Sequence, residues 1–344
     1  MKSRQVILEL QSNRLDVVLY EGDRQTQSAR IKIELDSDPI TWVEGVEKLQ
    51  KVLSKTVENL GLKGLPTIVY YSNSTQVVEL VSTEVKTISD ACEVARLRCI
   101  DSLPFSSLSS VCDANFVGKD TGRDLNMVHV LGAADREDAL EAMALLVEQS
   151  GLRFEYASPI SASIFRLLFD QRRRKSEKCE GRLYLGERHS YFLITDHGRL
   201  VFSRLINIGL DAMARSLTRP IRTEASSTEI ELDFDEARQI LLECGIPNKQ
   251  IMVDETRGLS SREIIPLMQP VLQRLLVELR QSLRFGLTEH QRSSVQIEIS
   301  GPGCALSGIE EYLGQELELT IEADLSYQGF AAGKPAAPES AGRA

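Results

Sequence analysis

The stretch Arg182–Leu205, RLYLGERHSYFLITDHGRLVFSRL, decides the fold of this chain. It predicts three short strands, because apolar residues alternate in RLYL, run together in SYFLI and return in RLVFSRL. The first turn is expected at Gly186, where a residue without a Cβ can take positive φ or let a ligand approach the backbone. The second turn is expected in the run TDHG at 195–198.

The same pattern occurs once before, near the start of the chain. The segment 6–33 reads VILELQSNRLDVVLYEGDRQTQSARIKI and also predicts strand, turn, strand, turn and strand. Leu8 and Leu10 precede Leu183 and Leu185 by a constant offset of 175 (183 − 8). Two such openings, one in each half, predict two similar lobes that face each other across a cleft.

Composition limits the classes of function. A length of 344 residues predicts two or three domains, and a net charge of −10 argues against broad binding of nucleic acid. The six cysteines contain no C-x-x-C pair, so we expect neither a metal site nor a disulfide framework. We find no leader and no apolar run of the roughly 18 residues that a membrane span needs, so we expect a cytoplasmic protein.

Strand and helix signals divide the chain as follows. Lobe one is expected at 1–75 and 156–170, interrupted by an inserted α+β subdomain at 76–155 whose last helix is capped by Asp135. A polar linker at 171–180 leads to lobe two at 181–328, which contains a smaller helical subdomain at about 221–290. The Ala/Pro/Gly/Ser-rich segment 329–344 is expected to be a disordered tail.

Lobe two is expected to contain two clear helices. Asp233 caps a helix that ends at Gly245, and a long amphipathic helix is expected from Pro270 to Leu287. A strand at 295–300 then runs into a Gly-Pro-Gly turn and a further helix.

Several segments in this order resemble a known family. They are IDSLPFSSLSSVCDANFVG, NMVHVLGAADREDALEAMALLVEQSGL, SPISASIFRLL, GRLVFSRLINIGLDAMARSL, LQRLLVELRQSLRF and IEISGPGCALSGIEEYLGQEL. Together they are similar to the PilM family of type IV pilus assembly proteins, actin-like relatives of the division protein FtsA. The resemblance implies an α/β, two-lobed actin-like fold (ribonuclease-H-like and duplicated) with a small α+β subdomain inserted in lobe one.

The resemblance also implies where in the cell the protein acts and which partners it binds. It suggests a cytoplasmic scaffold, peripheral to the inner membrane, which binds the N-terminal cytoplasmic peptide of a PilN-like membrane protein. Through that partner it would be linked to a PilO-like protein and to the pilus motor ATPases. We expect the peptide groove to include Val78, Leu80, Leu103 and Phe105, although the same residues also suit the core of the insert.

In this family a nucleotide binds between the lobes, with an aspartate before each hairpin turn. The first turn here keeps a carboxylate at Glu9 and a hydroxyl at Ser12, but Gln11 replaces the family's glycine. Asp16 stands near the place of the family's lysine, so a negative charge replaces a positive one.

In the second turn Gly186 is retained, but Tyr184 occupies the aspartate position and cannot bind hydrated Mg²⁺. Gly301 and Gly303 would let the backbone approach an adenine or ribose. All three glycines would equally serve as tight turns.

These changes predict a degenerate nucleotide site without catalytic residues. Desolvating a triphosphate without Mg²⁺ or a cation is costly, so we expect no ATP hydrolysis, weak or lost ATP binding and no cofactor. Two alternatives remain open, an active ATP-binding actin-like enzyme and an FtsA-like cell-division protein. The second would lead one to expect a C-terminal amphipathic membrane helix, which the tail does not resemble.

Overall fold

The computed structural model describes residues 3–11, 14–22, 24–32, 42–72, 75–85, 87–121, 126–170, 178–197, 199–222 and 229–323. The chain divides into two compact units, Met1–Phe169 and Asp170–Ala344, which we describe separately as lobe one and lobe two. The predicted tail at 329–344 and most of the predicted linker lie outside the described residues, as does Ser12.

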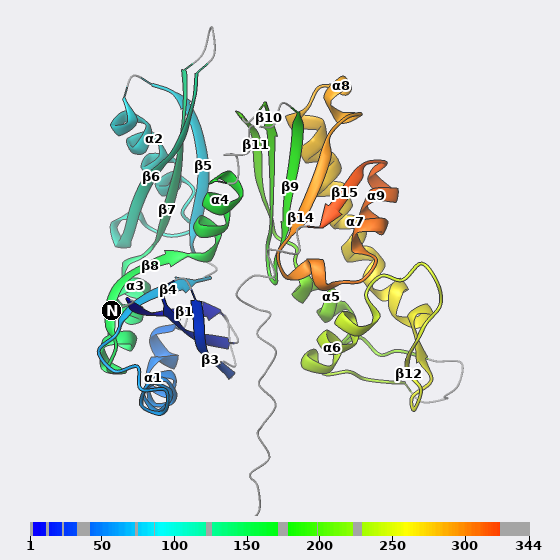
Figure 1. Ribbon diagram of the computed structural model, residues 1–344, viewed down its shortest axis with the longest axis horizontal. Coiled ribbons are helices and arrows are strands. Elements are labelled where there is room, and N and C mark those ends of the chain that lie inside the picture. Colours follow the sequence, from blue (N-terminus) through cyan, green and yellow to red (C-terminus); the bar gives the residue numbers. More distant parts are fainter. Residues whose placement is uncertain are drawn as a thin grey trace, which may run out of the picture. The chain divides into compact units, whose positions relative to one another are not determined.

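Lobe one is built on a five-stranded sheet in the order β3-β2-β1-β4-β8 (Figure 1). Its strands are β1 (Arg4–Gln11), β2 (Arg14–Glu21), β3 (Arg24–Lys32), β4 (Pro66–Tyr71) and β8 (Arg153–Pro159). The first three strands form an antiparallel meander, whereas β1, β4 and β8 run parallel. The predicted strand–turn–strand opening is therefore present in lobe one.

Two helices pack together against this sheet to form the core of lobe one. Helix α1 (Trp42–Asn59) contributes Leu49, Leu53 and Val57, which recur at the spacing of a helical face. Helix α3 (Glu137–Gln149) contributes Met143, Leu146 and Val147 to the same core. Helix α4 (Ile160–Asp170) follows β8 and ends the lobe.

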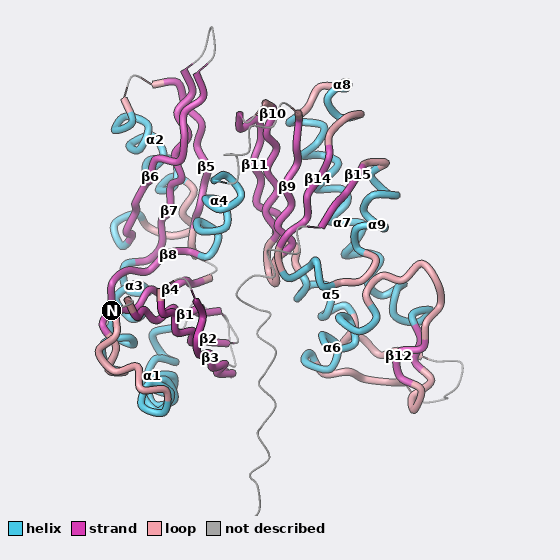
Figure 2. The backbone as a smooth tube through the Cα atoms, viewed as in Figure 1, coloured by secondary structure: helices cyan, strands magenta, loops and turns pink. Residues whose placement is uncertain are grey.

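The insert is a three-stranded antiparallel sheet with one helix. Its strands β5 (Val77–Glu84), β6 (Ser110–Thr121) and β7 (Asn126–Arg136) lie in the order β5-β7-β6. Helix α2 (Ile88–Asp101), capped by Thr87, covers one face through Ala91, Ala95 and Cys99, and Figure 2 shows it on that side of the strands. A one-turn helix, η2 (Ser107–Ser109), precedes β6.

The expected boundary of the insert at residue 155 is wrong. Helix α3 packs into the lobe-one core and β8 pairs with β4, so the part outside that core ends at about Arg136. The pattern strand–helix–strand–strand–helix was read correctly, but its last helix belongs to the larger sheet. Local periodicity cannot tell which of two neighbouring sheets an apolar helix face will cover.

Lobe two repeats the sheet of lobe one strand for strand. The strands β9 (Cys179–Leu185), β10 (Ser190–Asp196), β11 (Arg199–Ile206), β14 (Gln296–Ser300) and β15 (Thr320–Ala323) lie in the order β11-β10-β9-β14-β15. Leu183 pairs with Phe192, as Leu8 pairs with Val17, so the offset of 175 also holds for the register. The predicted duplication is confirmed.

The helices of lobe two share one core with its sheet. They are α5 (Leu210–Ser216), α6 (Phe234–Cys244), α7 (Ser261–Gly286), α8 (Glu289–Arg292), α9 (Ile309–Leu317) and the short η4 (Pro302–Ala305), with the short strands β12 (Met252–Asp254) and β13 (Leu259–Ser260). Asp233 caps α6 and Gly245 ends it, as predicted.

Helix α7 begins earlier than predicted. It starts at Ser261, where Ser260 and Glu263 form a capping box, and it contains both Pro266 and Pro270. The expectation that Pro270 marks the first turn is therefore wrong. The sequence contained the Ser-x-x-Glu signal, but proline was given more weight than the cap.

Candidate functional site

The turn between β9 and β10 is very tight at Gly186. A Cβ on this residue would lie 2.3 Å from the carbonyl oxygen of His189 and 3.0 Å from Cε1 of Tyr184. The carbonyl groups of Gly186 and Glu187 accept hydrogen bonds from the backbone N–H groups of Leu210 and Asp211, at 3.0 and 2.8 Å. The glycine is thus required by the reversal itself, and the backbone of the turn also binds the start of α5.

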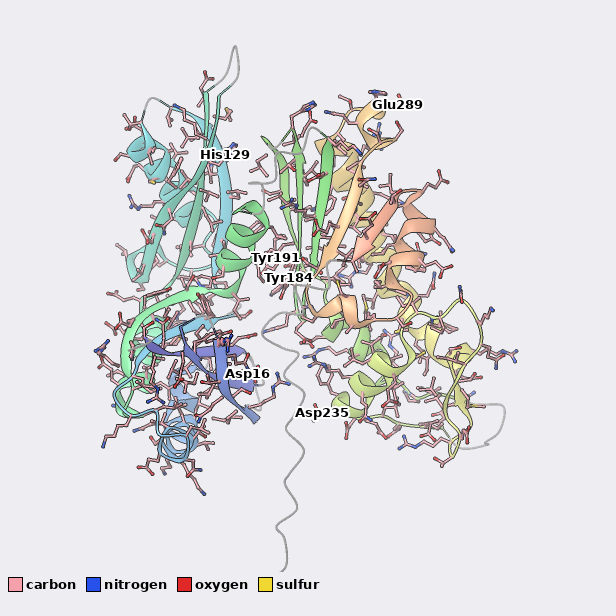
Figure 3. All side chains as sticks on the ribbon, viewed as in Figure 1. Asp16, His129, Tyr184, Tyr191, Asp235 and Glu289 are labelled. Atoms are coloured by element: carbon pink, nitrogen blue, oxygen red, sulfur yellow. The ribbon has the colours of Figure 1, made fainter. Side chains whose placement is uncertain are left out.

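Tyr184 lies at the position where the resemblance expects the second metal-binding aspartate. Its ring lies between two glycines, because a Cβ on Gly301 would also meet it, 2.8 Å from Cε2. The ring of Tyr191 lies beside it, with the two ring centroids 6.1 Å apart (Figure 3). An aromatic ring, and not a carboxylate, therefore occupies the space between the Gly186 and Gly301 turns.

The turn after β14 is explained by packing within lobe two. Gly301 has φ +88°, a left-handed conformation that favours glycine. A Cβ on Gly303 would lie 2.2 Å from Cγ of Leu185, whose side chain is fully buried. Of the two interpretations left open by the sequence, the tight-turn interpretation accounts for both glycines without a ligand.

The first turn of lobe one carries two acidic residues opposite each other. Glu9 pairs with Asp16 across β1 and β2, and the neighbouring strand places Arg30 opposite Asp16. Arg30 binds the buried Asp16 carboxylate through two hydrogen bonds, Nε to Oδ1 at 2.6 Å and Nη2 to Oδ2 at 3.1 Å. Figure 3 marks the position of Asp16 in this sheet.

This pair corrects one step of the sequence argument. We expected Asp16 to place a negative charge where the family has a lysine, and the structure shows that Arg30 supplies a counter-charge from β3. A paired carboxylate repels an anionic ligand far less than a bare one. The expectation of a degenerate nucleotide site therefore depends more on lobe two, where Tyr184 stands at the position at which the resemblance expects an aspartate.

Other candidates for metal chemistry are not supported. In the part of the chain that the structure describes, no group of three or more His, Cys, Asp or Glu side chains could hold a metal ion. Burial, and then the charge of Arg188, lower the pKa of His189, while a hydrogen bond with Asn207 opposes the shift. None of the described helices has the length and apolar character to cross a membrane.

The four expected groove residues do not form one surface pocket. Phe105 lines a pocket of about 520 Å³ between the segment that follows α2 and the start of α3. Its other lining residues are polar or charged: Ser106, Ser109, Arg136, Glu137, Asp138 and Glu141. Val78, Leu80 and Leu103 are half-buried and do not line it.

Sequence reasoning missed the acidic wall of this pocket. The run REDALE at 136–141 opens α3, and its carboxylates Glu137, Asp138 and Glu141 all line the pocket. Arg136 donates to Asp138, so part of this charge is neutralised. The pocket therefore combines one aromatic side chain with excess negative charge, which suits a peptide carrying apolar and basic residues.

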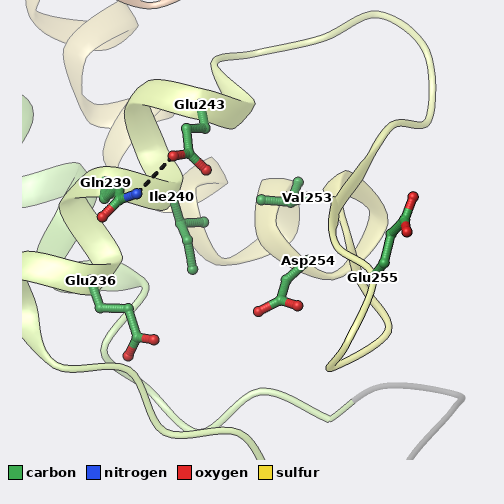
Figure 4. Close-up of a pocket in the computed structure, with 7 residues that line it drawn as sticks. All are labelled: Glu236, Gln239, Ile240, Glu243, Val253, Asp254 and Glu255. Carbon is green, nitrogen blue, oxygen red and sulfur yellow. Dashed lines mark hydrogen bonds between the residues drawn. The ribbon is translucent and has the colours of Figure 1, made fainter.

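A second pocket, of 310 Å³, lies between α6 and β12 in lobe two (Figure 4). It is lined by four carboxylates, together with Gln239, Ile240 and Val253: Glu236, Glu243, Asp254 and Glu255. Arg257 forms ion pairs with both Glu236 and Asp254. No pattern in the sequence indicated this pocket, because it forms only where β12 packs beside α6 in the folded chain.

Comparisons with known proteins identify the fold. No family model matches the chain, and no curated protein matches it by sequence. A chain of the structure described as "PilM-PilN type IV pilus biogenesis complex" matches with a TM-score of 0.66 and 16% identity, covering 94% of this chain and 88% of that chain. MreB 5 of Spiroplasma citri bound to AMPPNP matches with a TM-score of 0.51 and 11% identity, covering 95% and 93%.

At these identities the likeness concerns the fold. The same protein bound to ADP gives a TM-score of 0.50, again with coverage above nine tenths of both chains. The strand order repeated in both lobes agrees with a duplicated, two-lobed fold. The chain has the two-lobed actin-like fold, in a form similar to that of PilM.

Proposed function

We propose that this chain is a non-catalytic, PilM-like scaffold of a type IV pilus or related secretion platform. It would work on the cytoplasmic side of the inner membrane and bind the short cytoplasmic peptide of a PilN-like membrane protein. The similarity to a chain of the PilM–PilN complex, which extends over 94% of this chain, carries the proposal. A PilO-like protein and pilus motor ATPases would be reached indirectly, through the PilN-like partner.

The pocket beside Phe105 is our candidate for the peptide site. It adds an aromatic surface to the edge between the insert and α3, and its carboxylates would attract basic residues of the peptide. An extended peptide can also gain main-chain hydrogen bonds from an open sheet edge, such as that of β5. Apolar contact at Phe105 and charge at Glu137 and Glu141 would then select the sequence that binds.

Fluorescence polarisation with a labelled cytoplasmic peptide of the neighbouring membrane protein tests this site. We expect Phe105→Ala to weaken binding by about tenfold or more, the usual effect of removing an aromatic anchor. Phe116→Ala is the matched control, since Phe116 is an exposed aromatic residue of the insert that does not line the pocket. Equal affinity of wild type, Phe105→Ala and Leu80→Asp would remove the assignment.

We further infer that the nucleotide site of lobe two is degenerate. A magnesium-bound triphosphate needs anionic groups for the hydrated metal and open backbone N–H groups for the phosphates. Tyr184 provides no anionic group, and its ring lies between the two turns whose backbone N–H groups would have to bind the phosphates. The residues present do not fit Mg·ATP, so we assign no catalytic step and no cofactor.

Calorimetry with Mg·ATP tests this part separately. Loss of one metal-binding carboxylate should cost a few kcal/mol, or on the order of a hundredfold in affinity. We expect no binding at low micromolar concentrations and no release of phosphate. A low micromolar affinity would contradict the inference and would favour an active actin-like ATPase.

A further inference from the structure

The chain crosses between the lobe-one core and the insert twice, once outward and once back. The chain leaves the core after Tyr71, at the end of β4, and enters the insert at Val77. It returns from β7, which ends at Arg136, directly into α3. Asp135 therefore stands at the return crossing, one residue before β7 ends.

Asp135 ties the two crossings together through one carboxylate. It is 1% exposed, and its Oδ1 accepts hydrogen bonds from Thr75 Oγ1 at 2.6 Å and from the backbone N–H of Arg136 at 2.8 Å. The Tyr71 hydroxyl also donates to this carboxylate, and Tyr71 belongs to the buried core of lobe one. Thr75 lies on the outgoing crossing, 60 residues away in sequence.

This arrangement replaces the role that the sequence predicted for Asp135. We expected it to cap α3, but the cap position is Arg136 and no side chain caps the helix. A carboxylate buried this deeply is costly unless several donors satisfy it. Burial, and then the charge and hydrogen bond of Asp135, raise the pKa of Tyr71, so its hydroxyl stays protonated and remains a donor.

We propose that Asp135 is a clasp that holds the insert in a fixed orientation on the lobe-one core. Its donors come from the core strand, the outgoing crossing and the return crossing, so a swing of the insert about the crossings must break at least one of them. The acidic wall of the Phe105 pocket begins two residues after it, at Glu137. Opening the clasp would therefore alter the shape of that pocket.

Hydrogen–deuterium exchange of the full chain, without any partner, tests the clasp. Asp135→Asn removes the charge, and Thr75→Val and Tyr71→Phe each remove one donor. Losing one hydrogen bond to a buried charge corresponds to about tenfold to a hundredfold faster opening. We expect this acceleration in the edge strands of the insert and at both crossings, with β1 and β2 unchanged.

The exposed carboxylate of Asp138 is the matched control, because it lies three residues away and accepts a hydrogen bond from the Arg136 side chain. Asp138→Asn should leave exchange in the insert as in wild type. A uniform acceleration through β1, β2 and the insert would make Asp135 an ordinary core residue and overturn the proposal, as would unchanged exchange. If Asp135→Asn does not fold, the milder Tyr71→Phe gives the same test, and neither result depends on the proposed peptide partner.

Discussion

Substitution of Gly303 by alanine distinguishes a packing role from a ligand role for the turn after β14. The added Cβ would lie 2.2 Å from Cγ and 2.6 Å from Cβ of Leu185, which is fully buried. Overpacking of this kind costs about 1 to 3 kcal/mol. Since 1 kcal/mol shifts the melting temperature of a domain of this size by roughly 2 to 4 °C, we expect a loss of about 2 to 12 °C.

Circular dichroism during thermal unfolding measures this loss, with Gly64→Ala as a matched control. Gly64 has φ +75° and no atom within 4 Å of its missing Cβ, so alanine there adds only backbone strain, about 1 to 2 kcal/mol. Gly301→Ala combines both effects, because Gly301 has positive φ and also contacts the Tyr184 ring. A Gly303→Ala variant that melts within about 1 °C of wild type would refute the packing argument.

Three further predictions follow from single contacts. A double-mutant cycle with Asp16→Asn and Arg30→Gln, followed by urea unfolding, should give a coupling free energy of about 1 to 2 kcal/mol between the two side chains. The ion pair has one buried and one half-exposed partner. Strictly additive losses of stability in the double variant would contradict this. Because the pKa of His189 is lowered in the folded state, the unfolded chain binds the proton more readily, and stability should fall as the pH drops below about 6.5. His189→Gln should flatten the plot of urea midpoint against pH. An unchanged plot would contradict this. Leu53→Ala, on the buried face of α1, should lower the free energy of unfolding in urea by about 2 to 5 kcal/mol. Val52→Ala, at the exposed neighbouring position, should lower it by less than about 0.5 kcal/mol. Equal losses would contradict the assigned helix face.

The sequence was sufficient to predict the duplicated sheet. Apolar alternation is a local property, so the strands around Leu8 and Leu183 could be recognised from a few neighbouring residues. Their constant offset then predicted two lobes, and the shared strand order and register confirm it. The presence of a tyrosine, and not an aspartate, at position 184 could also be read from the sequence, because it needs only the position before a recognised turn.

The tertiary structure alone decided what these residues contact. Arg30 neutralises Asp16 through the register of a third strand, the ring of Tyr184 lies between Gly186 and the distant Gly301, and Asp135 accepts from Thr75 across the base of the insert. Each contact joins segments that are brought together by sheet pairing and chain crossing, and these depend on the whole core being packed. Periodicity and spacing describe only near neighbours along the chain, so they predicted the elements of the site but not its charges or its contacts.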